Sequence, residues 1–326
     1  MTQQGETEAL RKRVRRASNT TYDTIVDAAH SAEHAVESTA HKVYDTLTIA
    51  WDQLPSWQQD NHFILTGYRP PSLSFRRSFS SLLHLHNETI NIYTHLLGSL
   101  IALLLTYTLY TSLHPRYDLA TPADKTVFTF FFAGCFVCLG LSAFYHTVCN
   151  HSPEVCKFGN KLDYIGIVFM IAGSYVPSVF YGFKCHPHLR LVYWGITFLG
   201  GLACCIATFD PHFRTPRMRP WRAAMYVLYG ANGLIAVSHG VVLMGWREIE
   251  DRIQVVWMLG QGGLYVLGAV IYACRVPERW APGRFDIVGS SHQVFHCLVL
   301  AAAATHLGGV LRAFDYAHGE GAVCRV

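Results

Sequence analysis

Two histidines near the C-terminal end of the chain have the spacing of a metal site. His292 and His296 lie four residues apart in the run Ser291-His-Gln-Val-Phe-His296. On a helix this spacing places both imidazoles on one face, with Cβ atoms ~5–6 Å apart, so that both can bind one zinc ion at ~2.0–2.1 Å. His146, at the end of Ser142-Ala-Phe-Tyr-His146, is the candidate third ligand. Three histidines with one open position are typical of a catalytic zinc site, whereas structural sites usually close with four protein ligands.

The same residues also have an interpretation without a metal. A single buried histidine is more often a hydrogen-bonded core residue than a ligand, and the four-residue spacing recurs at His30 and His34, where a solvated helix face is the simpler interpretation. The metal site therefore depends on whether the fold brings His146 to the other two. Three further histidines of apolar segments are interpreted as forming hydrogen bonds between helices: His95, His239 and His306.

Asp163 and Ser142 are the candidate residues for proton transfer beside this site. Asp163 opens an apolar run in Lys161-Leu-Asp163-Tyr-Ile-Gly166, and Ser142 lies one helical turn before His146. A carboxylate next to a metal can hold its water or take a proton from it, and the serine hydroxyl can contact the same water. The alternatives are a contact of Asp163 with the helix dipole, worth ~0.3–1 kcal/mol, and a packing role for Ser142 between helices.

The composition indicates what kind of structure must position these residues. Of 326 residues, 51% are hydrophobic and 15% are charged, against about 25% charged in a typical soluble domain. The first 90 residues are polar, and the apolar excess begins after Asn91. Lysines and arginines are scattered over short connecting segments, so no nucleic-acid partner is expected. The sequence predicts a soluble N-terminal part followed by a membrane domain.

Seven apolar runs follow, each close to the ~20 residues that a helix needs to cross ~30 Å of hydrocarbon. No alternating barrel pattern is present, so helices must satisfy the backbone hydrogen bonds in lipid. The predicted fold is an all-α integral membrane protein, a seven-transmembrane helix bundle, with six spans as the alternative if the fourth run is re-entrant. The predicted spans are 91–112, 126–148, 162–183, 191–208, 223–245, 254–273 and 289–311.

The lysines and arginines of the loops predict the orientation of the bundle. With a cytosolic N-terminus, the inner loops hold nine of these residues and the outer loops six, and Arg76 and Arg77 add to the inner total. The N-terminus is therefore expected in the cytosol and the C-terminus outside. In this topology the second span ends, and the seventh begins, at the cytoplasmic face. His146, His292 and His296 are then at a similar depth.

The polar segments and the cysteines complete the predicted organisation. Between Thr20 and Trp51, apolar residues recur with a period near 3.6, which predicts an amphipathic helix that packs on the membrane domain or lies on the lipid surface. Most cysteines fall in apolar runs, whereas Cys185 and Cys324 fall in exterior segments and could pair. The expected parts are a disordered basic tail (1–19), cytosolic amphipathic helices and a linker (20–87), the seven-helix domain (88–313) and an exterior C-terminal tail (314–326).

Several sequence blocks in one order resemble a known family. They are Gly67-Tyr-Arg-Pro-Pro71, Glu88-Thr-Ile-Asn-Ile-Tyr-Thr-His-Leu-Leu-Gly98, Ser142-Ala-Phe-Tyr-His-Thr147, Lys161-Leu-Asp-Tyr-Ile-Gly166, Gly173-Ser-Tyr-Val-Pro177 and Ser291-His-Gln-Val-Phe-His296. Together they resemble the progestin and adipoQ receptor family, which includes adiponectin receptors, fungal osmotin-receptor-like proteins and bacterial hemolysin III relatives. The resemblance covers Leu54 to Leu311 and is closest to the adiponectin-receptor and fungal branch. Residues 1–50 depart from these receptors, so partner specificity is not carried over.

This resemblance implies a zinc ion on His146, His292 and His296 and an interior N-terminus. It also implies a ceramidase-type lipid amide hydrolase, linked to lipid and zinc homeostasis signalling, that splits ceramide into sphingosine and a fatty acid. In this hypothesis Asp163 passes a proton to the leaving amine and Ser142 orients the water. The expected partners are membrane lipids: ceramide or another sphingolipid, and free fatty acid.

Two other functions remain open from the sequence. In the first, the protein is a receptor for an extracellular protein or steroid ligand, and the zinc is structural and not catalytic. The second, zinc transport, is less favoured, because three histidines at one depth form a site and not a pathway across the bilayer. The plasma membrane is the expected location, with an internal membrane as the alternative.

Overall fold

The computed structural model describes residues 47–111, 116–214, 218–319 and 323–324, together with Val26, 28–34 and Val36. The chain divides into two units, Met1–Ile49 and Ala50–Val326. In the first unit, the described residues between Val26 and Val36 are helical and mostly exposed. The rest of the predicted amphipathic helix before residue 47, and the predicted disordered tail 1–19, lie outside the described residues.

Seven helical segments of the second unit are long and apolar enough to cross a membrane, which confirms the predicted fold. The fourth is a complete helix of 23 residues, so it is a span and not a re-entrant segment. No strand occurs in the described parts of the chain. The spans are α3 (Thr89–Thr111), α5 (Pro122–Val148), α6 (Pro153–Gly182), α7 (Pro187–Phe209), the pair α8 (Arg219–Ala231) and α9 (Gly233–Met244), α11 (Val255–Cys274) and α12 (Ser291–His318).

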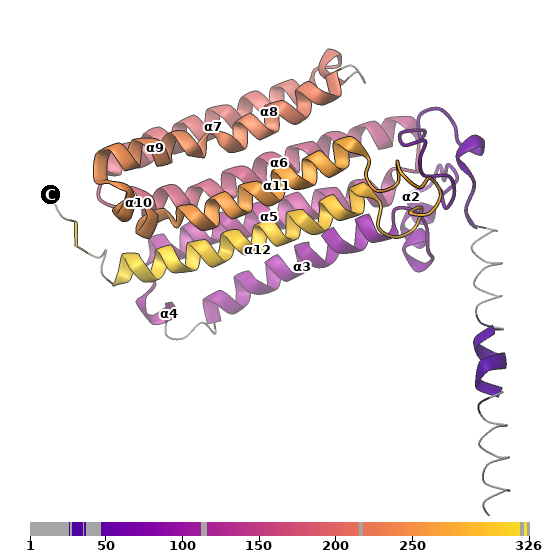
Figure 1. The fold of residues 1–326 in the computed structure, drawn as a ribbon, viewed down its shortest axis with the longest axis horizontal. Coiled ribbons are helices and arrows are strands. Elements are labelled where there is room, and N and C mark those ends of the chain that lie inside the picture. Colours follow the sequence, from indigo (N-terminus) through magenta and orange to yellow (C-terminus); the bar gives the residue numbers. More distant parts are fainter. Residues whose placement is uncertain are drawn as a thin grey trace, which may run out of the picture. The chain divides into compact units, whose positions relative to one another are not determined.

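The helices α5 and α6 form the central pair of the bundle (Figure 1). A Cβ atom at Gly134 would lie 2.5 Å from the carbonyl oxygen of Phe169, and one at Gly173 would lie 2.8 Å from that of Phe130. Glycine at these positions therefore permits the two backbones to approach closely, as small residues do in membrane bundles. The helix α3 packs on α5, α7 packs on α6, and α12 packs on α11 while also contacting α3 and α6.

Several helices extend beyond the apolar runs that predicted them. The helix α5 begins at Pro122, because Thr121 and Asp124 form a capping box at its first turn. The Ser152 hydroxyl accepts a hydrogen bond from the Val155 amide at the start of α6. At the other end of the chain, α12 continues to His318, past the expected boundary at residue 313. Its last turns bury Ala313, Phe314 and Ala317 in the core.

The fifth span is interrupted at Asn232, between α8 and α9. The Tyr175 hydroxyl donates a hydrogen bond to the Gly230 carbonyl oxygen at 2.5 Å. A Cβ atom at Gly233 would lie 2.4 Å from the same hydroxyl oxygen, so glycine leaves the space that Tyr175 occupies. The Tyr175 side chain, which belongs to α6, therefore enters the backbone hydrogen-bond ladder of the fifth span. Insertion of a side chain in this way is a known cause of helix interruption.

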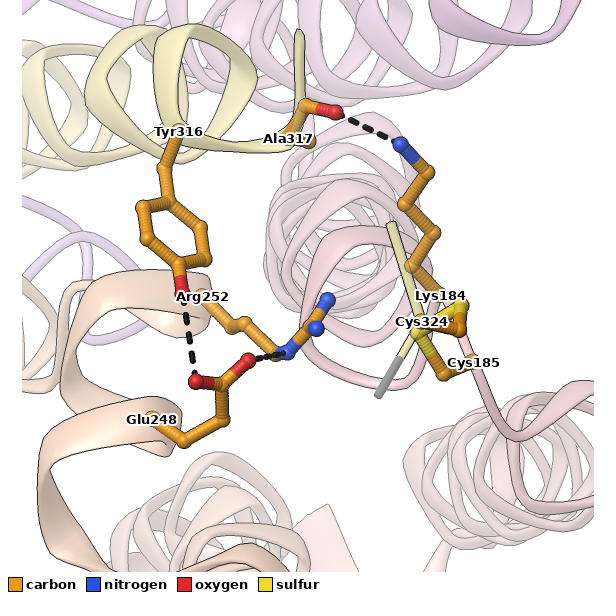
Figure 2. Close-up of a disulfide and its surroundings, with 7 residues drawn as sticks. All are labelled: Lys184, Cys185, Glu248, Arg252, Tyr316, Ala317 and Cys324. Carbon is orange, nitrogen blue, oxygen red and sulfur yellow. Dashed lines mark hydrogen bonds and ion pairs between the residues drawn. A yellow bond between two sulfur atoms is a disulfide. The ribbon is translucent and has the colours of Figure 1, made fainter. Parts of the chain in front are cut away.

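The end of the bundle where α6 and α12 finish is held by a disulfide and polar contacts (Figure 2). Cys185 and Cys324 form the disulfide that their position in the sequence allowed. Beside it, Lys184 donates a hydrogen bond to the Ala317 carbonyl oxygen at 2.6 Å. On α10 (Trp246–Ile253), Glu248 accepts hydrogen bonds from Arg252 at 2.6 Å and from Tyr316 at 3.2 Å.

Candidate metal centre

His146, His292 and His296 meet at one end of the bundle, as their spacing and the predicted topology indicated. One ring nitrogen from each lies within 4.8 Å of those of the other two. The Nε2 atoms of His146 and His292 are 3.2 Å apart. His146 and His296 are 3% and 1% exposed and His292 is half-buried, so the site lies at the margin of the protein interior and is mostly shielded from solvent.

Two helices running in opposite directions supply the three rings. His146 occupies the last turn of α5, and His292 is the second residue of α12. His296 follows one helical turn later, so that it shares a face of α12 with His292. The end of α5 and the start of α12 lie at the same end of the bundle (Figure 1). The site therefore exists only when both spans are in place.

The outer nitrogens of two of the rings have polar partners that set their orientation. His146 Nδ1 lies 2.7 Å from a carboxylate oxygen of Glu88, and His296 Nδ1 lies 3.1 Å from the Asn91 carbonyl oxygen. The side-chain amide of Asn91 in turn donates a hydrogen bond to the Glu88 carboxylate at 2.6 Å. Because the Nδ1 atoms are engaged in this way, the Nε2 atoms remain available to a metal. Carboxylate and carbonyl partners of this kind fix metal-binding histidines in many zinc proteins.

Glu88 is the acidic residue of this arrangement that spacing alone did not identify. Its side chain is 23% exposed, and the residue lies directly before the first residue of α3. Burial acts to raise the pKa of the Glu88 carboxyl, but its interaction with His146 and the hydrogen bond of Asn91 hold this pKa well below its usual range. Glu88 is therefore a carboxylate at neutral pH. Its position at the start of a span was the signal in the sequence that could have drawn attention to it.

The donor set fits a zinc ion. A tetrahedral ion held at ~2.0–2.1 Å brings its ligand nitrogens to roughly 3.4 Å from each other. The 3.2 Å separation of His146 and His292 Nε2 is close to that value, and all three ligand nitrogens lie within 4.8 Å of one another. Imidazole also binds copper, iron and nickel, so the identity of the metal remains a prediction.

Asp163 and Ser142 lie beside the histidines. Ser142 is 2% exposed and precedes His146 by one turn of α5. The carboxyl group of Asp163, on the neighbouring helix α6, interacts with the Ser142 hydroxyl and with His146. The structure thus brings both predicted residues to the site. Their roles in proton transfer stay a prediction.

The other intramembrane histidines divide into two kinds. His239 contacts the Tyr193 hydroxyl at 2.7 Å, and His306 contacts Gln261 at 2.8 Å, so these two form the predicted hydrogen bonds between helices. His95 was expected to do the same, but its ring stacks on that of His296, with 3.6 Å between centroids. It packs there because α3 crosses the first turns of α12. His95 therefore forms one wall of the metal centre.

Residues outside the spans hold the ends of the two helices that carry the candidate ligands. The buried Arg69 guanidinium donates to the carbonyl oxygens of His146, at 2.5 Å, and of Thr147, at 2.9 Å, and so caps the end of α5. The fully buried Glu278 accepts from the Ser291 amide at 2.8 Å, at the start of α12. It also accepts from Asn61 at 3.0 Å. Residues far apart in the sequence thus fix the two helix ends relative to each other.

Comparison with known proteins adds an independent finding. The family model described as haemolysin-III related matches residues 83–307. The chain is 41% identical to an adiponectin receptor protein of Drosophila melanogaster over 86% of its own length and 63% of the receptor's length. It is 40% identical to the ADIPOR-like receptor IZH2 of Saccharomyces cerevisiae, over 88% of this chain and 90% of the yeast protein. Heptahelical transmembrane protein 1 of Arabidopsis thaliana is 34% identical, over 82% and 81% of the two chains.

Proposed function

Because the chain belongs to the haemolysin-III related family of adiponectin-receptor-like membrane proteins, we propose that it is a zinc-dependent hydrolase of lipid amides of the ceramide class. The observation that supports this most is the convergence of His146, His292 and His296 at the ends of two spans. Three histidines leave one position of a tetrahedral zinc ion for water or substrate. When bound, such an ion lowers the pKa of water from 15.7 to about 7 and polarises a carbonyl group.

The residues around the histidines supply the remaining functions of the proposed site. Glu88 accepts a hydrogen bond from the Nδ1–H group of His146 and so keeps the opposite nitrogen of that ring directed inward. Asp163 is the group that takes a proton from water and gives it to the leaving amine. Ser142, which interacts with Asp163, holds this carboxyl group and the water in place. Hydrolysis then consumes one water, breaks the amide bond, and yields a fatty acid and sphingosine.

The location of the site favours a lipid substrate. His146 and His296 are buried at the ends of spans whose outward faces are apolar. An amide that lies near the headgroup region of the bilayer reaches this depth without leaving the membrane. Ceramide has its amide bond at that depth, between the sphingoid base and the acyl chain. A soluble amide would have to enter from water into a dry region, at the desolvation cost of its polar group.

We further propose that the metal centre faces the cytosol and that the protein resides in the plasma membrane. The disulfide Cys185–Cys324 lies at the opposite end of α12 from His292. Disulfides form in oxidising compartments, so this end belongs outside. The loop charges support the same orientation.

Purified full-length protein tests the hydrolase. Ceramide with a labelled acyl chain should release labelled fatty acid, and zinc should be present at one ion per chain by elemental analysis. In the His292→Ala, His296→Ala double variant, we expect both turnover and zinc to be lost. His306→Asn is the matched control, because His306 is a buried histidine of the same helix outside the triad. Full turnover by the double variant would refute the proposal.

A receptor with structural zinc is the second candidate, supported by the names of the relatives, which are receptors in insects and yeast. Its ligand would be an extracellular protein or steroid. In this case, removal of the metal should lower the melting temperature, and the protein should show no lipid hydrolysis with or without the metal. Chelation that abolishes hydrolysis while the protein stays folded separates the two candidates, and favours the hydrolase.

A further inference from the structure

The segment between residues 73 and 85, which we call the elbow, exposes apolar side chains at the end of the bundle that holds the metal centre. It contains α2 (Phe75–Ser80) and η2 (Ser81–Leu83). Figure 1 places α2 at the end where α12 begins. Five large apolar side chains of the elbow are exposed: Leu73 (74%), Phe75 (49%), Phe79 (46%), Leu83 (88%) and Leu85 (59%). Soluble proteins rarely leave so many large apolar side chains exposed on one short segment.

Two serine side chains of the same segment face the protein. Ser78 and Ser81 are 0% and 3% exposed. The Ser78 hydroxyl donates to Asn150 at 2.8 Å, and the Ser81 hydroxyl accepts from Arg69 at 2.7 Å. The elbow therefore differs from a helix on the surface of a soluble protein, which buries its apolar side, because it buries two serines and exposes its large apolar side chains. Exposed leucine and phenylalanine side chains in this number favour an apolar surrounding on the outer side of the segment.

The elbow is continuous with a surface that faces lipid. The Tyr93 hydroxyl of α3 donates to the Leu82 carbonyl oxygen at 2.8 Å, which fixes η2 against the first turns of this span. From Tyr93 an exposed apolar stripe continues along α3 through Leu97 and Leu100, which are 54% and 52% exposed. Since α3 spans the membrane, this stripe contacts acyl chains. The exposed side chains of the elbow continue this apolar stripe to the level of the lipid headgroups.

Two exposed arginines stand among these apolar side chains. Arg76 and Arg77 lie on α2, directly after Phe75. We propose that the elbow is a membrane-surface anchor, which inserts its leucine and phenylalanine side chains into the adjacent leaflet and binds anionic phospholipid headgroups through Arg76 and Arg77. Amphipathic segments with basic residues bind membranes in this manner. Each basic residue near an anionic surface contributes about 1 kcal/mol, roughly a fivefold preference.

Photocrosslinking in reconstituted bilayers tests the anchor. The full-length protein carries p-benzoylphenylalanine in place of Leu83, in discs of phosphatidylcholine with a minor share of phosphatidylserine. We expect phospholipid adducts on the elbow peptide by mass spectrometry. The same probe in place of Leu100 on α3 is the positive control. Crosslinks to residues 1–49 or to a second copy of the chain, or the absence of any adduct at Leu83 while the Leu100 probe reacts, would overturn the proposal.

The same adducts test the arginines. With Arg76 and Arg77 present, the share of phosphatidylserine among the adducts should exceed its share of the bilayer by roughly fivefold or more. In the Arg76→Gln, Arg77→Gln variant, this share should fall to that of the bilayer, while the total yield of adducts falls less. High salt should have the effect of the double substitution, because it screens exposed charges. An unchanged lipid preference in the variant would refute the assignment of headgroup binding to these arginines.

Discussion

At the scale of single residues, Glu88 is the group whose charge we expect to matter most for metal binding. It accepts hydrogen bonds from His146 and Asn91, and its negative charge raises the basicity of the His146 ring. Glu88→Gln keeps the size of the side chain and removes the charge. We therefore expect zinc affinity to fall ~10–100-fold, measured by competition with a chelator of known affinity. Folding should be retained, as judged by circular dichroism.

Glu154→Gln is the control for this experiment, because Glu154 is an exposed acid in the first turn of α6. Its substitution should leave zinc affinity unchanged. If Glu88→Gln bound zinc as tightly as the unaltered protein, Glu88 would be a structural residue of the segment before α3 and would play no part in metal binding.

His86 should make stability depend on pH. Burial and the nearby charge of Arg69 lower the pKa of His86 from 6.5 to about 2, and its side chain is fully buried. Between these two pH values the unfolded chain binds a proton that the folded chain does not. The free energy of unfolding therefore increases with pH up to about 6.5 and decreases when the pH is lowered from that value. His86 should therefore lower the free energy of unfolding by about 2 kcal/mol when the pH is changed from 7 to 5.

The measurement is thermal unfolding in detergent at a series of pH values. His86→Asn keeps an acceptor for the Glu88 amide, which now donates to His86 Nδ1 at 3.1 Å. This variant should lose less stability between pH 7 and pH 5 than the unaltered protein. Parallel curves for the two proteins would show that His86 already binds its proton in the folded state.

The sequence identified the histidines but not all of their partners. The spacing of His292 and His296 is a local pattern, and a helix dictates its geometry. The contact of Glu88 with His146 joins residues 58 positions apart, and it depends on how α3 and α5 pack. No periodicity encodes such a contact. The same reason explains why His95, which stacks on His296, was interpreted as an ordinary hydrogen-bonding histidine.

At the scale of elements, the end of α5 depends on a residue outside the spans. The Arg69 guanidinium donates to two carbonyl oxygens of its last turn and also contacts Ser81 and Cys149. Positive charge at a helix C-terminus is stabilising, and the carbonyl groups would otherwise be buried without a donor. Arg69→Met should therefore lower the free energy of unfolding by roughly 2–4 kcal/mol.

The effect should reach the metal, because Arg69 contacts the backbone of a proposed ligand. We expect Arg69→Met to release zinc faster on chelation, and Arg69→Lys to recover part of the stability, since an ammonium group keeps the charge but not the paired donors. Arg279→Met, at an exposed position of the loop before α12, is the control. Equal zinc retention in Arg69→Met and Arg279→Met would contradict a positioning role.

Elements were predictable where local composition determines them. Length and hydrophobicity indicated all seven spans, because the bilayer imposes both. The interruption at Asn232 was not predictable, since the Tyr175 hydroxyl that causes it belongs to a different span. The polar first turns of α5 and α6 were missed for another reason. Their caps lie outside the apolar run by which a span is recognised.

At the scale of the whole molecule, the two ends of the bundle are fastened by different means. At one end, Arg69 donates a hydrogen bond to the His146 carbonyl oxygen of α5, and Asn61 donates to Glu278, which accepts from Ser291 of α12. At the other, the Cys185–Cys324 disulfide and the Arg116–Asp315 ion pair, at 2.7 Å, hold the connecting segments and the end of α12 together. Hydrogen bonds are compatible with the reducing cytosol, whereas a disulfide persists only in an oxidising compartment such as the cell exterior. The chemistry of the two ends is thus itself an argument for the orientation.

Selective labelling of cysteines in intact cells measures that orientation. Cys274, at the end of α11 nearest the metal centre, is free and exposed, whereas Cys185 and Cys324 are paired at the opposite end. We expect a membrane-impermeant reductant followed by an impermeant maleimide to label Cys185 and Cys324, and to leave Cys274 unlabelled until the cells are permeabilised. Peptide mass spectrometry identifies each site. Labelling of Cys274 in intact cells, with the disulfide protected from the reductant, would place the histidines outside and would reverse the proposed route of the substrate.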